Sequence, residues 1–429
     1  MNSDKTITCY EHSTLYFDGA GLDSTYFKAL VRYNDLHGQK YFDVGLNKIK
    51  FKSYVGVIQA GNKIIEILPK ADRESESKAS TKNKWQGALL FMLNKAGYIK
   101  LNETERASQQ ARNTNLLDIY LYTFLKEVEQ LIHSGLVKKY RAESKNETAL
   151  KGRLRIERQI TLNNVHKERF FTAHTVYDRN NVLNQILNTA LQIVAKTTTN
   201  STIKQEAAKN LLFFEGVDQW LGFSLDLEKI KLDRKTKSYE YALELCKMII
   251  LNYCPDMKSG TQKVLALLFD MNLLFEKFIY RMLKAEEANF ITHKLQISRQ
   301  SSQIFWGDKT IRPDIVITYH IGNGASRNKI IVDTKWKIVD YDNPSDIDLK
   351  QMYAYNLQFN AGHSVLLYPF INQANAGLRE YSIGMRNFEF RHSCEMYFID
   401  LFEENKISMS FSSGFIKYLV GTEVVDKSQ

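Results

Sequence analysis

The chain has 429 residues, a net charge of +10 and a pI of about 9.1, and 44% of its residues are apolar. This length predicts two or three domains with packed cores, and the basic balance suits a polyanionic partner, although many basic proteins have none. No apolar run reaches about 18 residues, which argues against a membrane span. Four scattered cysteines rule out a CxxC zinc site, and with the polar amino terminus they predict a cytoplasmic protein.

The first 84 residues predict a β-rich region. Short alternating stretches separated by glycine and asparagine are typical of strands in a small barrel or sheet, and they cover residues 26–33, 41–44, 54–58 and 63–68. The sequence Gln-Ala-Gly-Asn at 59–62 is typical of a hairpin turn between the last two stretches. Residues 71–84 are polar and without periodicity, which predicts a mobile loop or linker, or an insertion that becomes ordered against a partner or DNA.

Residues 85–255 predict a mainly helical region. Apolar residues recur at intervals of three and four over Leu116–Ile132, Val182–Ala195 and Tyr239–Leu251. Two basic clusters, at 138–141 and 151–155, interrupt this pattern. Each could contact nucleic-acid phosphates without any choice of sequence, and each could equally be a solvated surface.

The remaining residues, 256–429, predict a compact α/β domain that begins with a helix. Apolar residues at helical spacing run from Thr261 to Met282, and Glu276 flanks that stripe. Glu276 is either a solvated glutamate or a carboxylate that turns from the edge of the core toward the two strands that follow.

Two carboxylates and one lysine mark those strands. Asp314 lies in the first, at 312–317, and Asp333 and Lys335 lie in the second, at 331–335, with a polar turn at 322–326 between them. A turn centred near 324–325 places position 314 opposite 335 and position 316 opposite 333, so the three side chains converge at one edge. Mg²⁺ prefers carboxylate oxygens, and a lysine beside it can position a water or offset the charge of a phosphate. The pattern therefore predicts a magnesium site for phosphodiester hydrolysis; the alternative is a surface hairpin with ordinary charges.

A helix and a buried strand follow the hairpin. Residues 343–345, Asn-Pro-Ser, are typical of a helix start, and residues 363–369 predict the strand. Gln351 and Tyr355 are four apart and share one helical face. They could hold a water of the metal or a DNA phosphate, or Tyr355 could simply pack in the core, as we expect for Tyr353.

Together these residues resemble the motifs of the PD-(D/E)xK nuclease superfamily, and Gln351-x-x-x-Tyr355 resembles the branch shared with RecB-type nucleases. The wider chain resembles the McrC family, the nuclease subunits of McrBC modification-dependent restriction systems, over most of residues 50–370. The likeness is carried by residues 54–59, 64–70, 151–155, 178–184 and 271–277.

The resemblance implies an α+β multidomain protein with a β-rich N-terminal region (1–84), a helical middle region (85–255) and a C-terminal α/β core of the restriction-endonuclease type (256–429). It implies that Asp314, Asp333 and Glu276 bind Mg²⁺ or Mn²⁺ and that Lys335 positions the water or steadies the transition state. Gln351 and Tyr355 would then orient DNA or the metal's ligands.

The resemblance also implies partners. In that family the N-terminal part inserts into the ring of a hexameric AAA+ GTPase of the McrB type, and the complex cuts double-stranded, methylated DNA. The present chain has no Gly-x-x-x-x-Gly-Lys-Ser/Thr loop, so the nucleotide-hydrolysing motor is expected in a separate chain. Two other functions stay open: a stand-alone repair nuclease of the RecB type, and a non-catalytic adaptor that regulates an NTPase.

Overall fold

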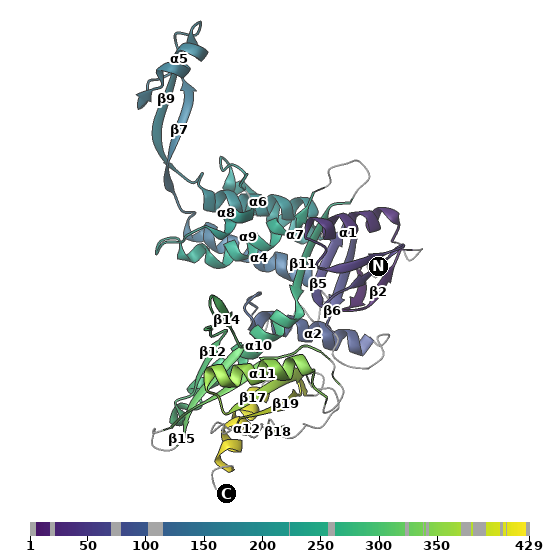
Figure 1. Cartoon of the computed structure of the whole chain (residues 1–429). Helices are drawn as coiled ribbons and strands as arrows, with labels where there is room; N and C mark the ends of the chain where they lie inside the picture. The colour runs from purple at the N-terminus through teal and green to yellow at the C-terminus, as the bar shows by residue number, and fades with distance from the viewer. Residues whose placement is uncertain are drawn as a thin grey trace.

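The structure, a computed structural model, describes residues 6–17, 22–69, 79–101, 115–222, 224–255, 262–321, 326–337, 339, 343–369, 379–380, 392–403, 406–408 and 410–425. The predicted mixture of helices and strands in an α+β multidomain arrangement is confirmed (Figure 1). A five-stranded and a six-stranded sheet occupy different parts of the molecule, and a long β-arm projects away from a group of helices. The division of the chain at residues 84 and 255 stays a prediction.

The N-terminal part is built on the five-stranded sheet. In spatial order its strands are β1 (Thr6–Tyr10), β6 (Lys63–Leu68), β5 (Tyr54–Ala60), β11 (Val264–Asp270) and β10 (Tyr253–Cys254). β1 runs parallel to β6, and the other neighbours are antiparallel. The predicted hairpin turn is confirmed, since Ala60 pairs with Lys63 and Gly61 has a φ of 56° that suits a two-residue loop.

Helix α1 (Ser24–Leu36) covers one face of this sheet together with a small sheet of β2 (Thr14–Tyr16), β4 (Lys48–Phe51) and β3 (Phe42–Gly45). The predicted strand at 26–33 is therefore wrong. The Asp23 carboxylate accepts the backbone N–H of Thr25 at 2.8 Å and caps a helix. Leu30 and Tyr33 are both buried at helical spacing. The prediction from alternating apolar residues overlooked this spacing.

Residues 264–270 form the strand β11 and not the first half of a helix that starts at Thr261. β11 pairs with β5 along its whole length. Leu265 and Leu267 enter the main core on one face, while Ala266 and Leu268 enter the core under α1 on the other. A strand that is buried on both faces shows a continuous apolar run, and such a run cannot be distinguished from a buried helix by periodicity alone. The true helix, α10 (Met271–Ala285), begins after Asp270, which caps it.

Helices cover the other face of the five-stranded sheet and fill the main core. The α-helices are α2 (Ala79–Lys95), α4 (Leu116–Ser134), α6 (Val182–Thr197), α7 (Ser201–Leu211), α8 (Ser224–Glu228) and α9 (Glu240–Leu251), with short 3₁₀ turns η1 (Leu212–Phe214) and η2 (Lys237–Tyr239). The three helices predicted from periodicity correspond to α4, α6 and α9. The predicted linker at 71–84 falls mostly outside the described residues, and its last six residues begin α2.

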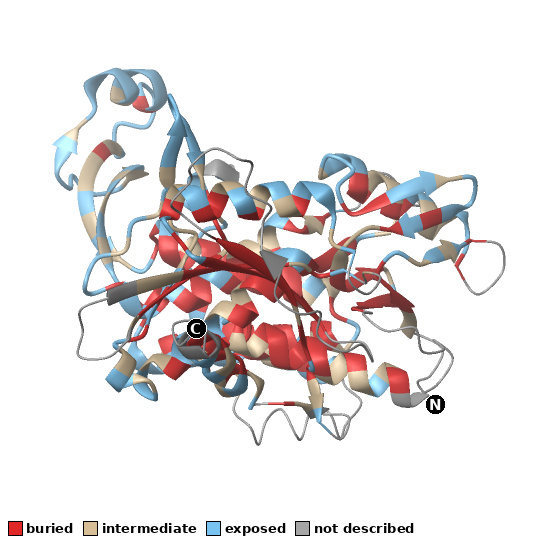
Figure 2. Ribbon diagram, turned by 60° about the horizontal axis from the view of Figure 1, so that its bottom comes forward, coloured by how far each residue is buried: buried red, intermediate tan, exposed pale blue. Residues whose placement is uncertain are grey.

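The arm consists of β7 (Lys139–Glu147), β8 (Arg153–Leu154), α5 (Ile156–Asn163) and β9 (Phe170–Asp178). β7 and β9 pair from Lys139 opposite Asp178 to Glu147 opposite Phe170. The arm is largely exposed (Figure 2). The prediction of a mainly helical middle region is wrong here, because these strands bury too few side chains to produce an apolar alternation that a sequence could show.

The C-terminal part is built on the six-stranded sheet, in the order β12 (Gln296–Arg299), β15 (Ile315–Ile321), β16 (Ser326–Thr334), β17 (His363–Pro369), β19 (Ser393–Ile399) and β18 (Arg379–Glu380). α11 (Asp346–Phe359) lies on one face, and α10 and α12 (Phe411–Val425) lie on the other. Short elements complete it: η3 (Glu286–Ala288), η4 (Ile291–His293), β13 (Gln303–Trp306), β14 (Lys309–Ile311), β20 (Phe402–Glu403) and β21 (Lys406–Ile407). The two strands of the predicted hairpin, the following helix and the buried strand at 363–369 are confirmed, while residues 322–325 of the predicted turn lie outside the described residues.

Across the described ranges, none of the helices combines the length and the apolar character that crossing a bilayer requires. All four cysteines are buried, and none forms a disulfide.

Candidate functional site

The start of β15 and the end of β16 bring Asp314 and Asp333 together. β15 pairs with β16 so that Ile315 lies opposite Val332, and the next step of this register places Asp314 opposite Asp333. The predicted register, with 316 opposite 333, is wrong by two residues. A shift of two residues keeps every side chain on its face of the sheet, so the predicted convergence survives the error. Asp314 Oδ2 accepts hydrogen bonds from Thr334 N at 2.9 Å and Thr334 Oγ1 at 2.8 Å.

Asp333 is a buried carboxylate beside another carboxylate. Only 3% of the residue is exposed. Burial, with a further contribution from the charge of Asp314, raises the pKa of Asp333 to about 7. Lys335 Nζ lies 2.7 Å from Asp333 Oδ2 in an ion pair, and no other donor among the described residues satisfies that buried oxygen. Among the described residues, the Lys335 ammonium is therefore the sole partner of this buried oxygen.

Lys335 connects the site residues of β16 with those of α11. Its ammonium also lies 3.1 Å from Asp348 Oδ1 and donates to Gln351 Oε1 at 3.2 Å. Burial by itself opposes the charge, but the carboxylates of Asp333 and Asp348 outweigh it and raise the pKa of Lys335. The lysine is thus held as a cation between β16 and α11. Asp348 is a site residue that the sequence reasoning missed, although its position three residues before Gln351 on the same helical face could have indicated it.

Gln351 and Tyr355 extend this network along α11, as their spacing predicts. Gln351 Nε2 donates to Tyr355 OH at 2.7 Å, and Tyr355 OH donates to the backbone oxygen of Arg312 at 3.2 Å. The chain of bonds links the helix to the segment just before Asp314. The Tyr355 ring also packs in the core between α11 and the sheet, which confirms the packing considered for it, while a contact with a water of the metal or a DNA phosphate stays a prediction. Tyr353 lies outside this network, 39% exposed, with its ring against His392.

Glu276 is 5% exposed, which makes the interpretation as a solvated glutamate wrong. It projects from α10, and its Oε1 accepts hydrogen bonds from Arg299 Nε at 2.8 Å and Gln300 Nε2 at 2.9 Å. Burial and then the charge of Asp314 raise the pKa of Glu276. The carboxylate therefore senses the charge of Asp314, but Arg299 neutralises it locally. Arg299 and Gln300 were not identified from the sequence.

Within the described ranges no three His, Cys, Asp or Glu side chains approach closely enough to form a ready metal cluster. The donor set nevertheless fits a hard divalent cation. Asp314 and Asp333 offer oxygen atoms, the charge of Asp314 raises the pKa of both Asp333 and Glu276, and among the described residues Asp333 Oδ2 contacts no donor other than Lys335. A divalent ion would relieve both strains, and oxygen ligands favour Mg²⁺ or Mn²⁺.

Comparison with known proteins identifies the family. The model of the McrBC 5-methylcytosine restriction system component matches residues 49–369. The chain belongs to this family. The resemblance seen in the sequence is thereby confirmed.

Relatives of this McrBC-family chain support the family assignment. The type IV methyl-directed restriction enzyme EcoKMcrBC of Escherichia coli (strain K12) is 24% identical over 294 residues, which are 66% of this chain and 79% of that protein. A refined half-complex of Thermococcus gammatolerans McrB AAA+ hexamers with bound McrC contains a chain that superposes with a TM-score of 0.66 at 21% identity. That alignment covers 97% of the present chain and 100% of the other, and it shows a shared fold.

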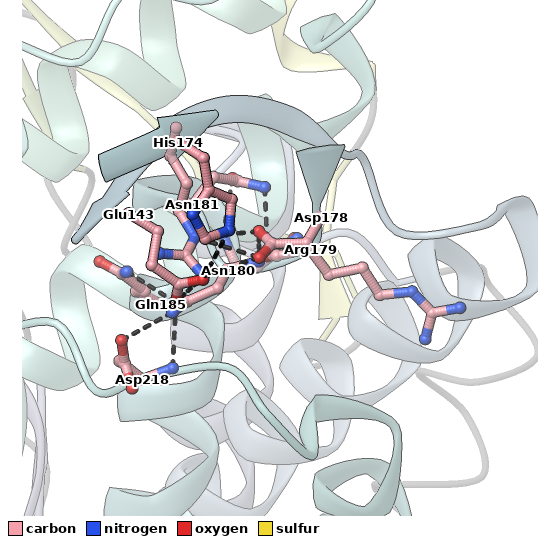
Figure 3. Close-up of polar contacts among 10 residues, drawn as sticks. Glu143, His174, Asp178, Arg179, Asn180, Asn181, Gln185 and Asp218 are labelled. Carbon is pink, nitrogen blue, oxygen red and sulfur yellow. Dashed lines mark hydrogen bonds and ion pairs between the residues drawn. The ribbon is translucent and has the colours of Figure 1, made fainter. Parts of the chain in front are cut away.

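The family motif at 178–184 lies at the root of the arm (Figure 3). Asn184, fully buried on α6, donates to the backbone oxygens of Val137 at 2.9 Å and Arg179 at 2.7 Å, where the two arm strands leave the helices. Asn181 donates to the same two oxygens. Tyr239 OH closes the network by donating to Asn184 Oδ1 at 3.0 Å. The motif therefore fixes the direction of the arm.

Other residues of the motif form further hydrogen bonds at the root of the arm. Asn180 Nδ2 donates to Asp218 Oδ2 at 2.6 Å, and Asp178 binds both Nε and Nη2 of Arg141. The Arg179 side chain extends away from this network (Figure 3). Arg141 belongs to the basic cluster at 138–141, and its guanidinium is already neutralised by Asp178 and Glu143. That member of the cluster is a structural cation, and the cluster at 151–155 lies farther out, at β8.

Proposed function

We propose that this chain is the metal-dependent endodeoxyribonuclease subunit of an McrBC-type restriction complex. One observation carries the proposal: Asp314, Asp333 and Lys335 converge at the end of a hairpin, where Lys335 donates to Gln351 of α11 and Gln351 donates to Tyr355. The sheet, with α10 on one face and α11 on the other, supports assignment of this part to the restriction-endonuclease type of core.

Each side chain has a role in phosphodiester hydrolysis. Asp314, Asp333 and Glu276 would hold Mg²⁺ or Mn²⁺, which when bound supplies a Lewis acid for the phosphate and for the attacking water. Lys335 orients the water and stabilises negative charge on the phosphate in the transition state. Asp348 and Gln351 restrict the ammonium to that position, since they bind it from α11. Tyr355 fixes Gln351 and the backbone before Asp314.

The proposed partners are double-stranded DNA and a separate AAA+ GTPase of the McrB type. The Thermococcus gammatolerans complex contains McrB AAA+ hexamers with bound McrC, and its shared fold supports the same kind of assembly for this chain. Residues 1–84 stay the candidate region for partner binding. The arm is a second candidate, because it projects with exposed apolar side chains such as Ile156, Ile160 and Val165.

The test varies the partner. The purified chain is incubated with methylated and unmethylated plasmid, Mg²⁺ and GTP, with and without the AAA+ protein encoded beside it. We expect cutting of methylated plasmid that needs both the partner and GTP. Cutting by the chain alone would replace this proposal with a stand-alone repair nuclease. Stimulated GTP hydrolysis without any cutting would replace it with a regulatory adaptor.

A further inference from the structure

Trp336 directly follows the lysine of the proposed nuclease site but points to the other side of the strand. Lys335 and Lys337 both reach Asp348 on α11. The Trp336 ring instead lies in the main core, 5.1 Å from the Phe275 ring of α10 and 6.3 Å from the Trp85 ring of α2. Phe275 itself precedes Glu276. The indole therefore follows the site residue Lys335 in sequence and packs against Phe275, the neighbour of Glu276.

The indole is tied to the N-terminal sheet by a buried hydrogen bond. Trp336 Nε1 donates to Glu11 Oε1 at 2.7 Å. Glu11 stands in the turn after β1, and its backbone N–H donates to Leu68 O at 3.0 Å, which fixes it to the end of β6. The two residues are 325 positions apart in the sequence. A carboxylate that is 5% exposed and bonded across two parts of a protein is costly to bury, so such a bond serves geometry better than it serves stability.

Few backbone hydrogen bonds among the described residues hold the segment around Lys335. β16 ends at Thr334, and the described backbone bonds beyond it are Lys335 N to Leu367 O at 2.8 Å and Lys337 N to Lys335 O at 3.1 Å. Because consecutive side chains point to opposite faces of an extended segment, a rotation that frees Trp336 also moves Lys335. The anchored indole thus limits where the ammonium can be.

We propose that Trp336, held by Glu11, is a positioning residue for Lys335, so that the N-terminal sheet sets the geometry of the nuclease site. The inference rests on the proposed nuclease function and adds a physical route from the candidate partner-binding region, residues 1–84, to that site. A shift of the N-terminal sheet on the partner changes the position of Glu11, and through Trp336 the position of the lysine.

The test uses the full chain in complex with its AAA+ partner and compares four single variants and the double variant of Trp336→Phe with Glu11→Ala. Trp336→Phe keeps an aromatic ring but removes the donor, Glu11→Ala removes the acceptor, and Glu11→Gln keeps an acceptor oxygen. Tyr418→Phe is the matched control, because it removes a comparable bond, 2.7 Å to Glu395 Oε2, elsewhere in the same part of the protein. Measured are kcat and KM for DNA cleavage, stimulation of GTP hydrolysis, and the thermal midpoint, with every assay well below that midpoint.

We expect Trp336→Phe and Glu11→Ala to lower kcat by about tenfold or more, since a displacement of about 1 Å can cost about 10²-fold. KM for DNA and GTPase stimulation should not change, and Glu11→Gln should retain most of the activity. The kcat of the double variant should be no lower than the kcat of the less active single variant, because both changes remove the same hydrogen bond.

Two results would overturn the inference while leaving the nuclease function intact. The first is cleavage by Trp336→Phe and Glu11→Ala within about twofold of the unmodified complex, which is the ordinary variation among surface variants. The second is a loss of cleavage in Tyr418→Phe as large as the loss in Trp336→Phe. If the unmodified complex itself cuts nothing in Mg²⁺ or Mn²⁺, the proposed function fails and the inference fails with it.

Discussion

Replacing Asp333 by asparagine should stabilise the metal-free protein at neutral and alkaline pH, even though it should destroy activity. The folded state holds Asp333 buried beside Asp314, which raises its pKa from 3.8 to about 7. A group with a raised folded pKa contributes stability that is complete below its unfolded pKa and is lost as the pH rises through the folded value. The loss for Asp333 therefore develops between about pH 4 and pH 7, and asparagine, which cannot ionise, avoids it.

The size of the effect follows from the same shift. A change from 3.8 to about 7 corresponds to about 4 kcal/mol. This is a ceiling, because asparagine also gives up the ion pair with Lys335, so we expect on the order of 2 kcal/mol at pH 8. At about 2–4 °C per kcal/mol for a domain of this size, the thermal midpoint should rise by roughly 5 °C.

The assay is thermal unfolding in EDTA at pH 4 and pH 8. Asp348→Asn is the matched control with the opposite sign. Burial opposes ionisation of Asp348, but Lys337 and Lys335 outweigh it and lower its pKa, so that substitution should destabilise at pH 8. Added Mg²⁺ should stabilise the unmodified protein at pH 8 and not Asp333→Asn. A lower midpoint for Asp333→Asn at pH 8 in EDTA, or a difference that does not depend on pH, would refute the electrostatic reasoning.

Three further predictions concern single side chains. Lys335→Gln should reduce cleavage by at least about 10²-fold at unchanged GTPase stimulation, measured in single-turnover assays, because it removes the cation at the phosphate; near-normal cleavage would exclude that role. Tyr355→Phe should lower the cleavage rate only several-fold, about 1 kcal/mol, because it removes one neutral hydrogen-bonding group and keeps the ring; a loss as large as that of Lys335→Gln would assign Tyr355 a direct part in the reaction. Asn184→Ala should destabilise by about 2–3 kcal/mol, because it removes two buried hydrogen bonds to the backbone at the arm root and the acceptor of the Tyr239 hydroxyl, and trypsin should then cut the arm faster; unchanged proteolysis would refute the role of the motif.

Local chemistry allowed much of the C-terminal part to be predicted. The alternation around Asp314 and Asp333 fixes their face of the sheet, and an error of two residues in the register leaves that face unchanged. α11 begins directly after Ser345, at the predicted helix start, and Gln351 reaches Lys335 from this helix. These features depend on neighbours within a few residues, so sequence spacing contains them.

Other features depend on tertiary contacts that no spacing encodes. β11 looks helical because both of its faces are buried, one against the helices and one against α1. The arm strands show no strand pattern in the sequence, because few of their side chains are buried. Arg299 reaches Glu276 from a neighbouring element, and Trp336 meets Glu11 only because two distant parts of the chain pack together. Partners of this kind could be identified only once the fold was known.

The central claim is that Asp314 and Asp333 form the centre that cuts DNA. Its most direct test is the time course of methylated-plasmid cleavage by the complex in Mg²⁺ and GTP, with unmodified chain, Asp333→Asn and Lys350→Ala. Lys350 pairs with Asp346 on the exposed side of α11 and serves as the charge-changing control. We predict cleavage by the unmodified and Lys350→Ala complexes, and none by Asp333→Asn, which still stimulates GTP hydrolysis. Cleavage by Asp333→Asn at the unmodified rate would contradict the account.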